Sequence, residues 1–463
     1  MTKKIVLINS DAEYTSFERN KGAEAVMIST VELLRHSIPE AQFVTTMQCS
    51  QSLSQRLNCE VIKNRISSTT VYSLFASLKS NIDVLRCMVW KALRKYLRID
   101  LKALVNNKKL REYSSADVII HLGMDLYSDD FGPLTIIEHS KDILLGVMLG
   151  KPVVMWAESI GPFRHKFTRW LAKSTLNRVC IITVREELSK RNLQDIRVNK
   201  PLIYVTLDPA FLLEPAPEER VQSILHSEGI CTNAGPLIGM TLTYPVDSSQ
   251  KLSRFAFMKL LYRTLQYALP GRLFLSAVSI GKRLGLYSSV GAPKEFRYTK
   301  LMAQIIVHLV ENLNATIMLV PHQEGAGPLV SERAIHENVR AQVEYKDKVK
   351  LVSGDYPAPE VKGIIGKCHL FIGSKMHSNI AALSQCIPTV GLAYSYKFRG
   401  IMEMLGQQNY VCSNITFEEV ISKVIDAWNK RVEIRTELES RLKDVRALST
   451  LNARLVKEFV DSR

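Results

Sequence analysis

Residues 368–399, CHLFIGSKMHSNIAALSQCIPTVGLAYSYKFR, indicate the fold of this chain most directly. The apolar run from His369 to Ile372 predicts a buried strand, and the segment that begins near Ser374 predicts a helix. Pro388 ends the helical segment, and a second apolar run follows it. This order of strand, glycine, helix, proline and strand is typical of a β–α–β unit in a parallel sheet.

The start of this predicted helix is a candidate anion-binding site. Ser374 is a good N-cap residue, and Lys375 and His377 follow it in the first turn. The N-terminus of a helix exposes unpaired N–H groups and carries partial positive charge, which favours a phosphate or a carboxylate. The imidazole of His377 would suit proton transfer beside such an anion. The alternative is an ordinary β–α–β unit with a polar first turn.

Composition is typical of a folded enzyme. With 463 residues, 46% hydrophobic and 23% charged, the chain is long enough for two or three domains with substantial cores. No stretch of 18 uncharged apolar residues predicts a transmembrane helix, and the opening MTKKIVLINSD predicts a strand rather than a signal peptide. The eight cysteines lie singly, without a CxxC pair. We therefore expect reduced thiols in a cytoplasmic protein, and no zinc site.

The net charge of +16 favours anionic partners. Between Lys79 and Arg111 there are ten lysines or arginines and two acids, and apolar residues recur at helical spacing. This pattern predicts a basic amphipathic helical insertion over 70–112. The helix either packs on its own domain with a solvated basic face, or contacts anionic lipid or a lipid-linked substrate at the inner face of a membrane. No nucleic-acid module signature is present, so we expect no nucleic-acid partner.

The rest of the chain predicts two similar halves. DVIIHLG (117–123) and GKPVVMWAESIGP (150–162) flank a helical segment in the same order as the elements of 368–399. We therefore expect an α/β fold with two Rossmann-like domains facing across a cleft, and ligands at the carboxyl ends of the strands. The expected divisions are an N-terminal domain at 1–214, a linker at 215–236, a C-terminal domain at 237–414 and C-terminal helices at 415–463.

Eight motifs in order make the chain resemble the polysaccharide pyruvyl transferase family. They are NKGAEAV (20–26), ADVIIHLGMD (116–125), ESIGPF (158–163), TVREELS (183–189), LDPAFLL (207–213), LVPH (319–322), GSKMHSNIAAL (373–383) and PTVGLAYSYK (388–397). The resemblance runs roughly from Lys4 to Leu405 and implies a two-domain fold of the GT-B glycosyltransferase type. It also implies an enzyme that moves pyruvate from phosphoenolpyruvate onto a sugar of an exopolysaccharide or cell-surface glycan precursor, as a ketal, without a further cofactor.

This chemistry makes three demands on a site. Cations and a helix N-terminus must hold the carboxylate and phosphate of the donor. The methylene carbon of the donor must gain a proton, and two sugar hydroxyls must lose theirs. The resemblance places an anion site in the C-terminal domain and the acceptor sugar, free or lipid-linked, against the N-terminal domain.

The resemblance assigns residues to the donor side. His377 matches the histidine of the family motif and is the candidate acid and base, and Arg185 would reach the donor from the other domain. Lys375 stands where the family usually has arginine, so a single point charge replaces a planar fork. Lys397, after the following strand, would help neutralise phosphate. The predicted donor-binding residues are Lys375, Arg185, Lys397, Ser374 and Gly373.

The acceptor side is less sharply indicated, and each candidate has a structural alternative. Glu158 is either a second catalytic group or the partner of a basic neighbour. Asp125 binds sugar hydroxyls or caps the next turn, and Asp208 binds hydroxyls or forms the turn before a proline. His322 is either a cleft residue or a hydrogen-bonded structural histidine. The predicted acceptor-binding residues are Asp125, Asn20, Gly22, Asp208 and His322.

Two other functions stay open. A GT-B glycosyltransferase that uses a nucleotide sugar would share this fold, but it would require a ribose-binding carboxylate near the end of the site helix, and Ser374 to Gln385 contain no acid. A non-catalytic relative that binds an anionic sugar is favoured if Lys375 disables donor binding. No clustered carboxylates predict a metal site.

Overall fold

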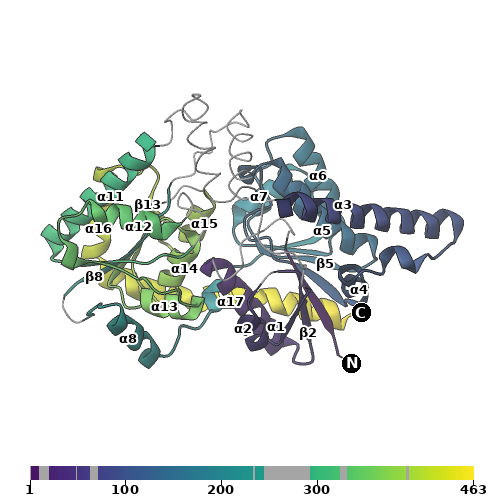
Figure 1. The fold of residues 1–463 in the computed structure, drawn as a ribbon, viewed down its shortest axis with the longest axis horizontal. Coiled ribbons are helices and arrows are strands. Elements are labelled where there is room, and N and C mark those ends of the chain that lie inside the picture. The colour runs from purple at the N-terminus through teal and green to yellow at the C-terminus, as the bar shows by residue number, and fades with distance from the viewer. Residues whose placement is uncertain are drawn as a thin grey trace.

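The computed structural model describes residues 2–9, 20–47, 49–62, 71–232, 235–244, 292–323, 331–392 and 396–463. Its N-terminal domain is built on a seven-stranded parallel sheet of order β3-β2-β1-β4-β5-β6-β7 (Figure 1). The strands are β1 (Lys4–Ile8), β2 (Gln42–Thr45), β3 (Cys59–Val61), β4 (Val118–His121), β5 (Val153–Glu158), β6 (Ile181–Val184) and β7 (Leu202–Val205). The strand order reverses between β1 and β4, which is the position where open α/β sheets bind ligands.

Helices cover both faces of this sheet because both faces are apolar. Ile5 and Leu7 of β1 belong to one buried cluster, whereas Val6 and Ile8 belong to another, as the alternation of side chains along a strand requires. The helices are α1 (Lys21–Ser37), α2 (Gln51–Arg56), α3 (Val71–Ala92), α4 (Lys108–Ser115), α5 (Pro133–Met148), α6 (Lys166–Leu176) and α7 (Glu187–Asp195).

The C-terminal domain repeats this architecture on a six-stranded parallel sheet of order β10-β9-β8-β11-β12-β13. The strands are β8 (Leu237–Thr241), β9 (Thr316–Leu319), β10 (Val349–Leu351), β11 (Leu370–Gly373), β12 (Thr389–Leu392) and β13 (Val411–Cys412). The helices are α11 (Ala292–Leu313), α12 (Glu332–Ala341), α13 (Ala358–Ile365), α14 (Met376–Leu383), α15 (Tyr396–Met404) and α16 (Phe417–Asn429). The unit β11–α14–β12, with its two strands paired in parallel, confirms the interpretation of residues 368–399.

One detail of that interpretation is wrong. The N-cap of α14 is Lys375, whose side chain makes no capping hydrogen bond, and not Ser374. The N–H of Ser374 donates to the carbonyl of Thr241 on β8, so Ser374 still continues the sheet and the helix begins later. The Ser374 hydroxyl instead lies 3.3 Å from the hydroxyl of Tyr298.

Two segments connect the domains. The chain leaves β7 through the short helix η5 (Pro209–Leu212) and then forms α8 (Glu218–Ser227), which packs on α13 of the C-terminal domain. The long helix α17 (Arg431–Asp461) returns from the C-terminal domain and packs against α1, β5 and η5 (Figure 1). None of the described helices is long and apolar enough to cross a bilayer.

The return of α17 depends on one buried amide. Asn452 accepts a hydrogen bond from the Thr206 hydroxyl at 2.9 Å and donates to the carbonyl of Leu207 at 3.1 Å. We expect Asn452→Ala to lower the free energy of unfolding by about 1–3 kcal/mol, because it leaves buried polar groups unpaired. Thr450→Ala on the exposed face of the same helix is the control. Thermal melts and limited proteolysis within α17 are the measurements, and equal effects of both variants would contradict this role.

Candidate active site

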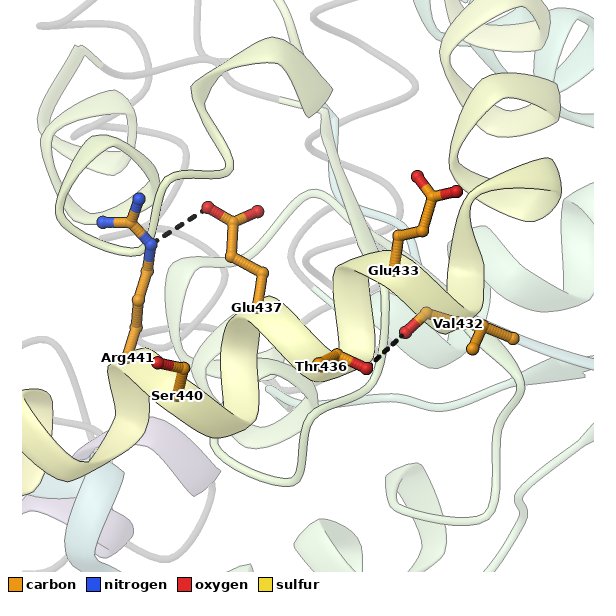
Figure 2. Close-up of a pocket in the computed structure, with 6 residues that line it drawn as sticks. All are labelled: Val432, Glu433, Thr436, Glu437, Ser440 and Arg441. Atoms are coloured by element: carbon orange, nitrogen blue, oxygen red, sulfur yellow. Dashed lines mark hydrogen bonds and ion pairs between the residues drawn. The ribbon is translucent and has the colours of Figure 1, made fainter.

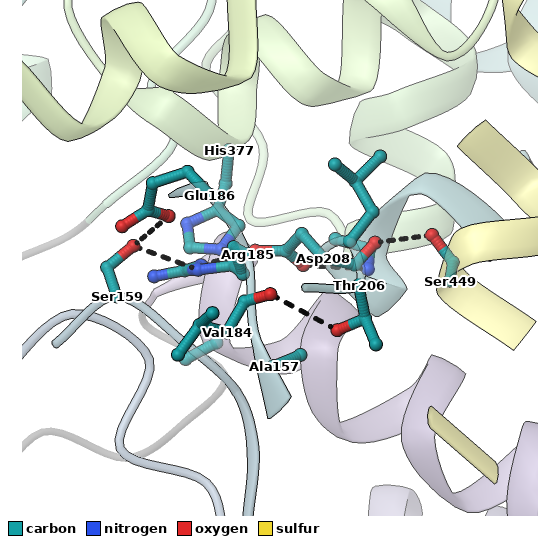
Figure 3. Close-up of polar contacts among 12 residues, drawn as sticks. Ala157, Ser159, Val184, Arg185, Glu186, Thr206, Asp208, His377 and Ser449 are labelled. Atoms are coloured by element: carbon teal, nitrogen blue, oxygen red, sulfur yellow. Dashed lines mark hydrogen bonds and ion pairs between the residues drawn. The ribbon is translucent and has the colours of Figure 1, made fainter. Parts of the chain in front are cut away.

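The carboxyl edges of the two sheets meet at a pair of side chains. His377 lies in the first turn of α14, just after β11, and Asp208 follows β7 in the other domain. Nε2 of His377 is 3.4 Å from Oδ2 of Asp208, which is ion-pair distance without the alignment of a hydrogen bond. The same carboxylate oxygen accepts a hydrogen bond from Nη1 of Arg185, which follows β6 (Figure 3). Residues predicted for opposite sides of the site are therefore in direct contact.

Arg185 is fully buried in this cluster. Its Nε donates to the Ser159 hydroxyl at 3.2 Å, and that hydroxyl donates to Glu186 at 2.8 Å. Burial acts to lower the pKa of Arg185, but the negative charges of Asp208, Glu186 and Asp125 outweigh burial and raise the pKa. Nη2 of Arg185 has no hydrogen-bond partner among the described residues. The site thus holds a fixed cation whose donors are not all satisfied by the described residues.

Asp208 holds this cation and also shapes the backbone. Its carboxylate accepts from the N–H of Ala210 at 2.9 Å and so caps η5, while the Ser449 hydroxyl of α17 donates to its carbonyl at 3.2 Å. Burial acts to raise the pKa of Asp208, but Arg185 and His377 outweigh it and hold the pKa well below its usual range. Asp208 is therefore an anion whose carboxylate lies against the imidazole of His377.

The start of α1 lies against the same histidine. A Cβ atom placed on Gly22 would overlap Cγ, Nδ1 and Cβ of His377, so only glycine permits this approach. Asn20 is the N-cap of α1, and its side-chain oxygen accepts from the N–H groups of Gly22 and Ala23 at 3.1 and 3.3 Å. The structure therefore brings Asn20 and Gly22, both predicted for the acceptor side, to His377.

His322 closes the site from the end of β9. Its carbonyl accepts from the N–H of Lys21 at 3.0 Å, which joins β9 of one domain to α1 of the other. Burial is the main cause that lowers the pKa of His322 well below its usual range, and the positive charges of His377, Lys375 and Lys21 add to it. The imidazole of His322 is accordingly neutral at physiological pH.

The side chain of Lys375 is held by Gln323 and Glu332. Its Nζ donates to Oε1 of Gln323 at 2.6 Å and lies 3.6 Å from Oε1 of Glu332. The other carboxylate oxygen of Glu332 accepts from the N–H groups of His322 and Gln323 at 2.7 and 2.9 Å. A single buried carboxylate thus positions both the end of β9 and the lysine that replaces the arginine of the family motif.

Other predicted residues lie further from this cluster. The Glu158 carboxylate is fully buried and pairs with Nδ1 of His121 at 2.6 Å and with the N–H of Gly123 at 3.0 Å. These contacts are all within the N-terminal domain, so the structure does not bring Glu158 to His377. Nε2 of His121 forms a hydrogen bond with Nδ1 of His139 at 2.9 Å. Burial lowers the pKa of His139 well below its usual range.

Three predicted residues have simpler placements. Asp125 is half-buried, and its charge contributes to raising the pKa of Arg185. Gly373 packs against Asn379, whose amide donates to its carbonyl at 3.0 Å, so this glycine permits a tight start to α14. Lys397 lies in the first turn of α15, and its side chain is outside the described residues. No cluster of metal-ligating side chains occurs in the described ranges.

Five residues of the cluster were not predicted from the sequence. They are Lys21, Ser159, Glu186, Gln323 and Glu332. The first three lie inside the motifs NKGAEAV, ESIGPF and TVREELS, so the sequence indicated the segments that contain them but not these residues. Glu332, the first residue of α12, lies in no motif, and its polar contacts with His322 and Lys375 could not be read from the sequence.

A separate concave surface lies on α17 and contains no predicted site residue (Figure 2). Its lining comes from one helix only, namely Val432, Glu433, Thr436, Glu437, Ser440 and Arg441. Glu437 and Arg441 pair across it at 3.0 Å. It is a groove between neighbouring side chains of one helix, and we assign it no function.

The fold defines a GT-B-like protein. The structure is similar over 99% of its length to all of Anabaena Alr3699/HepE in complex with UDP, with a TM-score of 0.55 and 10% identity. It is also similar to UDP-GlcNAc 2-epimerase from Methanocaldococcus jannaschii, with a TM-score of 0.52 and 12% identity over 92% of this chain and 93% of that one. At these identities the similarity concerns the fold alone.

The sequence identifies the family within this fold. Residues 20–396 match the model of the polysaccharide pyruvyl transferase family, and the chain belongs to that family. It is also 22% identical over 343 residues to the amylovoran biosynthesis protein AmsJ of Erwinia amylovora, which covers 73% of this chain and 71% of AmsJ. The resemblance described above, to a transferase family of two Rossmann-like domains, is confirmed.

Gly22→Ala tests the contact between α1 and His377. The added methyl overlaps the imidazole, so we expect a loss of about 1–3 kcal/mol in the free energy of unfolding, typical of overpacking. In a His377→Ala background the same change should cost clearly less, because the overlapping Cγ and Nδ1 atoms are gone and only the contact with Cβ remains. Denaturant titration of the four proteins measures this coupling. An equal cost of Gly22→Ala in both backgrounds would contradict the contact.

Asp208→Asn tests the buried ion pair. It leaves Arg185 buried without its counter-charge, and we expect a loss of about 3–5 kcal/mol in the free energy of unfolding. Arg220→Gln breaks a solvent-exposed pair with Glu360 and should change the free energy of unfolding little, because water screens such a pair. The pKa of Asp208 is lowered in the folded state, so its stabilising contribution is complete above the unfolded-state pKa of about 3.9 and is lost as the pH falls below it. Denaturation at neutral and acidic pH should show this loss in the wild type and not in Asp208→Asn.

Proposed function

We propose that the protein transfers pyruvate from phosphoenolpyruvate onto a sugar of an exopolysaccharide or other cell-surface glycan precursor, as a ketal. The contact of His377 with Asp208, which also pairs with Arg185, carries this proposal. An imidazole at the start of a helix, next to a buried carboxylate that is itself paired with a cation, supports a role for His377 in proton transfer. Membership of the pyruvyl transferase family and the similarity to an amylovoran biosynthesis protein support the substrate class.

The donor has two anionic groups, and the site has matching positive groups. Lys375 and the backbone N–H groups at the start of α14 would hold one anion on the C-terminal domain. The unpaired Nη2 of Arg185 would bind the other from the N-terminal domain. Because the two cations belong to different domains, binding of one donor molecule also fixes the relative position of the domains.

The reaction balances with His377 as acid and base. A proton adds to the methylene carbon of the donor, which becomes the methyl group, while a sugar hydroxyl attacks the neighbouring carbon and loses its proton. A second hydroxyl of the sugar then attacks the same carbon, and phosphate leaves with the electron pair of the broken C–O bond. His377 moves these protons, and the Asp208 carboxylate stabilises the imidazolium that forms. Asp125 and Asn20, on the N-terminal domain, are the proposed contacts for the acceptor.

Two alternatives have less support. A nucleotide-sugar transferase would need a carboxylate for ribose, and α14 (MHSNIAAL) has none. A non-catalytic relative would follow if Lys375 prevented donor binding, yet Lys375 is the N-cap of the site helix, two residues before His377, so a cation is retained at the start of this helix. No cofactor is proposed beyond the donor itself.

Donor binding is the direct test. Phosphoenolpyruvate at 100 times its Kd should stabilise the folded protein by about 2.7 kcal/mol, measured as a rise in melting temperature. Lys375→Ala should weaken this binding about tenfold or more, since it removes a charge-assisted contact, whereas Lys443→Ala on α17 should not change it. Stabilisation by UDP or UDP-sugars and none by phosphoenolpyruvate would overturn the proposal in favour of the glycosyltransferase.

Turnover separates binding from catalysis. With a lipid-linked oligosaccharide extract as acceptor, His377→Ala should release phosphate from phosphoenolpyruvate about 100- to 10,000-fold more slowly, typical for loss of a general acid–base. Its affinity for the donor should change much less. Lys375→Arg should retain turnover if the position serves as a cation. A wild type that binds the donor but never releases phosphate would favour the non-catalytic alternative.

A further inference from the structure

Helix α3 has two apolar faces, and only one of them is buried. Cys87 and Trp90 point into the core of the N-terminal domain, where α3 packs on α5. The opposite side, which we call the outer face, consists of Ile82, Leu85, Met88 and Val89, all of which are exposed. A helix that merely covers its own domain would carry polar residues there.

The exposure of apolar side chains is concentrated in this region. Leu85 is 61% exposed and Met88 56% exposed. The described residues include sixteen large exposed hydrophobic side chains, and eight of these lie between Ile82 and Leu101. In Figure 1, α3 extends along the outer edge of the N-terminal domain, beyond α5.

Positive charge surrounds the same surface. Residues 81–102 contain six basic residues and two acids, a net charge of +4. The two acids have internal partners, since Asp83 accepts from Asn107 at 2.7 Å and Asp100 from the indole of Trp90 at 2.8 Å. Five basic side chains make no ion pair with any residue of the described ranges, namely Lys91, Arg94, Lys95, Arg98 and Lys102.

The chain folds so that these charges gather at one end of the outer face. After Ala92 the helix widens into a π-turn (Leu93–Leu97) that ends at Arg98 in the left-handed conformation, with φ 56°. This region, 93–102, which we call the basic tip, also exposes Tyr96, Leu97, Ile99 and Leu101. All residues from Arg94 to Lys102 are exposed, and apolar and basic side chains are mixed along this stretch.

We propose that the outer face and the basic tip of α3 bind the surface of a membrane that contains anionic lipid headgroups. The apolar side chains would enter the boundary between headgroups and acyl chains while the lysines and arginines remain at the phosphates. A second copy of this chain is a poorer occupant, because two surfaces of net charge +4 repel one another. The proposal does not depend on the chemistry of the active site.

Flotation of the full-length protein with vesicles tests this. We expect binding to vesicles of phosphatidylcholine with phosphatidylglycerol, little binding to phosphatidylcholine alone, and weakening as salt screens the charges. Lys95→Gln with Arg98→Gln should lower the partition coefficient roughly 25-fold, at about fivefold for each charge. Leu85→Ser with Met88→Ser should lower it at least about tenfold, because apolar area is no longer buried.

The control variant is Val432→Ser with Lys443→Glu, which makes similar changes on the exposed face of α17 and should bind as the wild type does. Circular dichroism confirms that each variant is folded. Absence of binding to anionic vesicles at low salt, or binding that neither α3 variant weakens, would overturn the proposal. A dimer in sedimentation that Leu85→Ser with Met88→Ser dissolves would overturn it too, in favour of an interface between copies.

Discussion

The buried pair of Arg185 and Asp208 is the constraint around which the site is organised. Removing both charges from water is costly, and one carboxylate cannot by itself satisfy all the donors of a guanidinium. Nε of Arg185 donates to Ser159, which in turn donates to Glu186, whereas Nη2 has no hydrogen-bond partner in the described part of the chain. The pair also places an anion next to His377 of the other domain. A charge pair that costs desolvation energy is therefore better explained by its position at the domain contact than by stability.

Much of the fold follows from local sequence because its physical causes are local. Strands buried on both faces are continuous apolar runs, and this made β4, β5, β11 and β12 recognisable without any tertiary information. Site residues could be predicted for a related reason. In a parallel sheet the polar residue that follows each strand reaches the same edge, which brings Arg185, Asp208, His322 and His377 together.

Side-chain direction could not be predicted, and Glu158 shows why. The register between β5 and β6 shifts between Met155 and Glu158, and Ala157 adopts a left-handed φ of 48°. This irregularity changes the alternation of faces, so that Glu158 points to His121 while Ser159 points to Arg185. Alanine rarely adopts a positive φ, so an alanine at position 157 does not predict this irregularity. The outer face of α3 is a similar case, because an apolar face predicts burial without saying what buries it.

The lysine at position 375 is explained by its neighbours. An ammonium group has three N–H donors, and Gln323 accepts from one of them at 2.6 Å, while Glu332 lies 3.6 Å away. Both oxygens of Glu332 already accept other hydrogen bonds, Oε1 from the Thr243 hydroxyl and Oε2 from the N–H groups of His322 and Gln323, so this carboxylate offers no free pair of oxygens to the planar fork of a guanidinium. Lysine keeps its charge at the N-cap of α14 and retains a donor for an anion. The planar fork that the family usually places here is then needed less, because Arg185 presents an unpaired N–H group on the opposite domain.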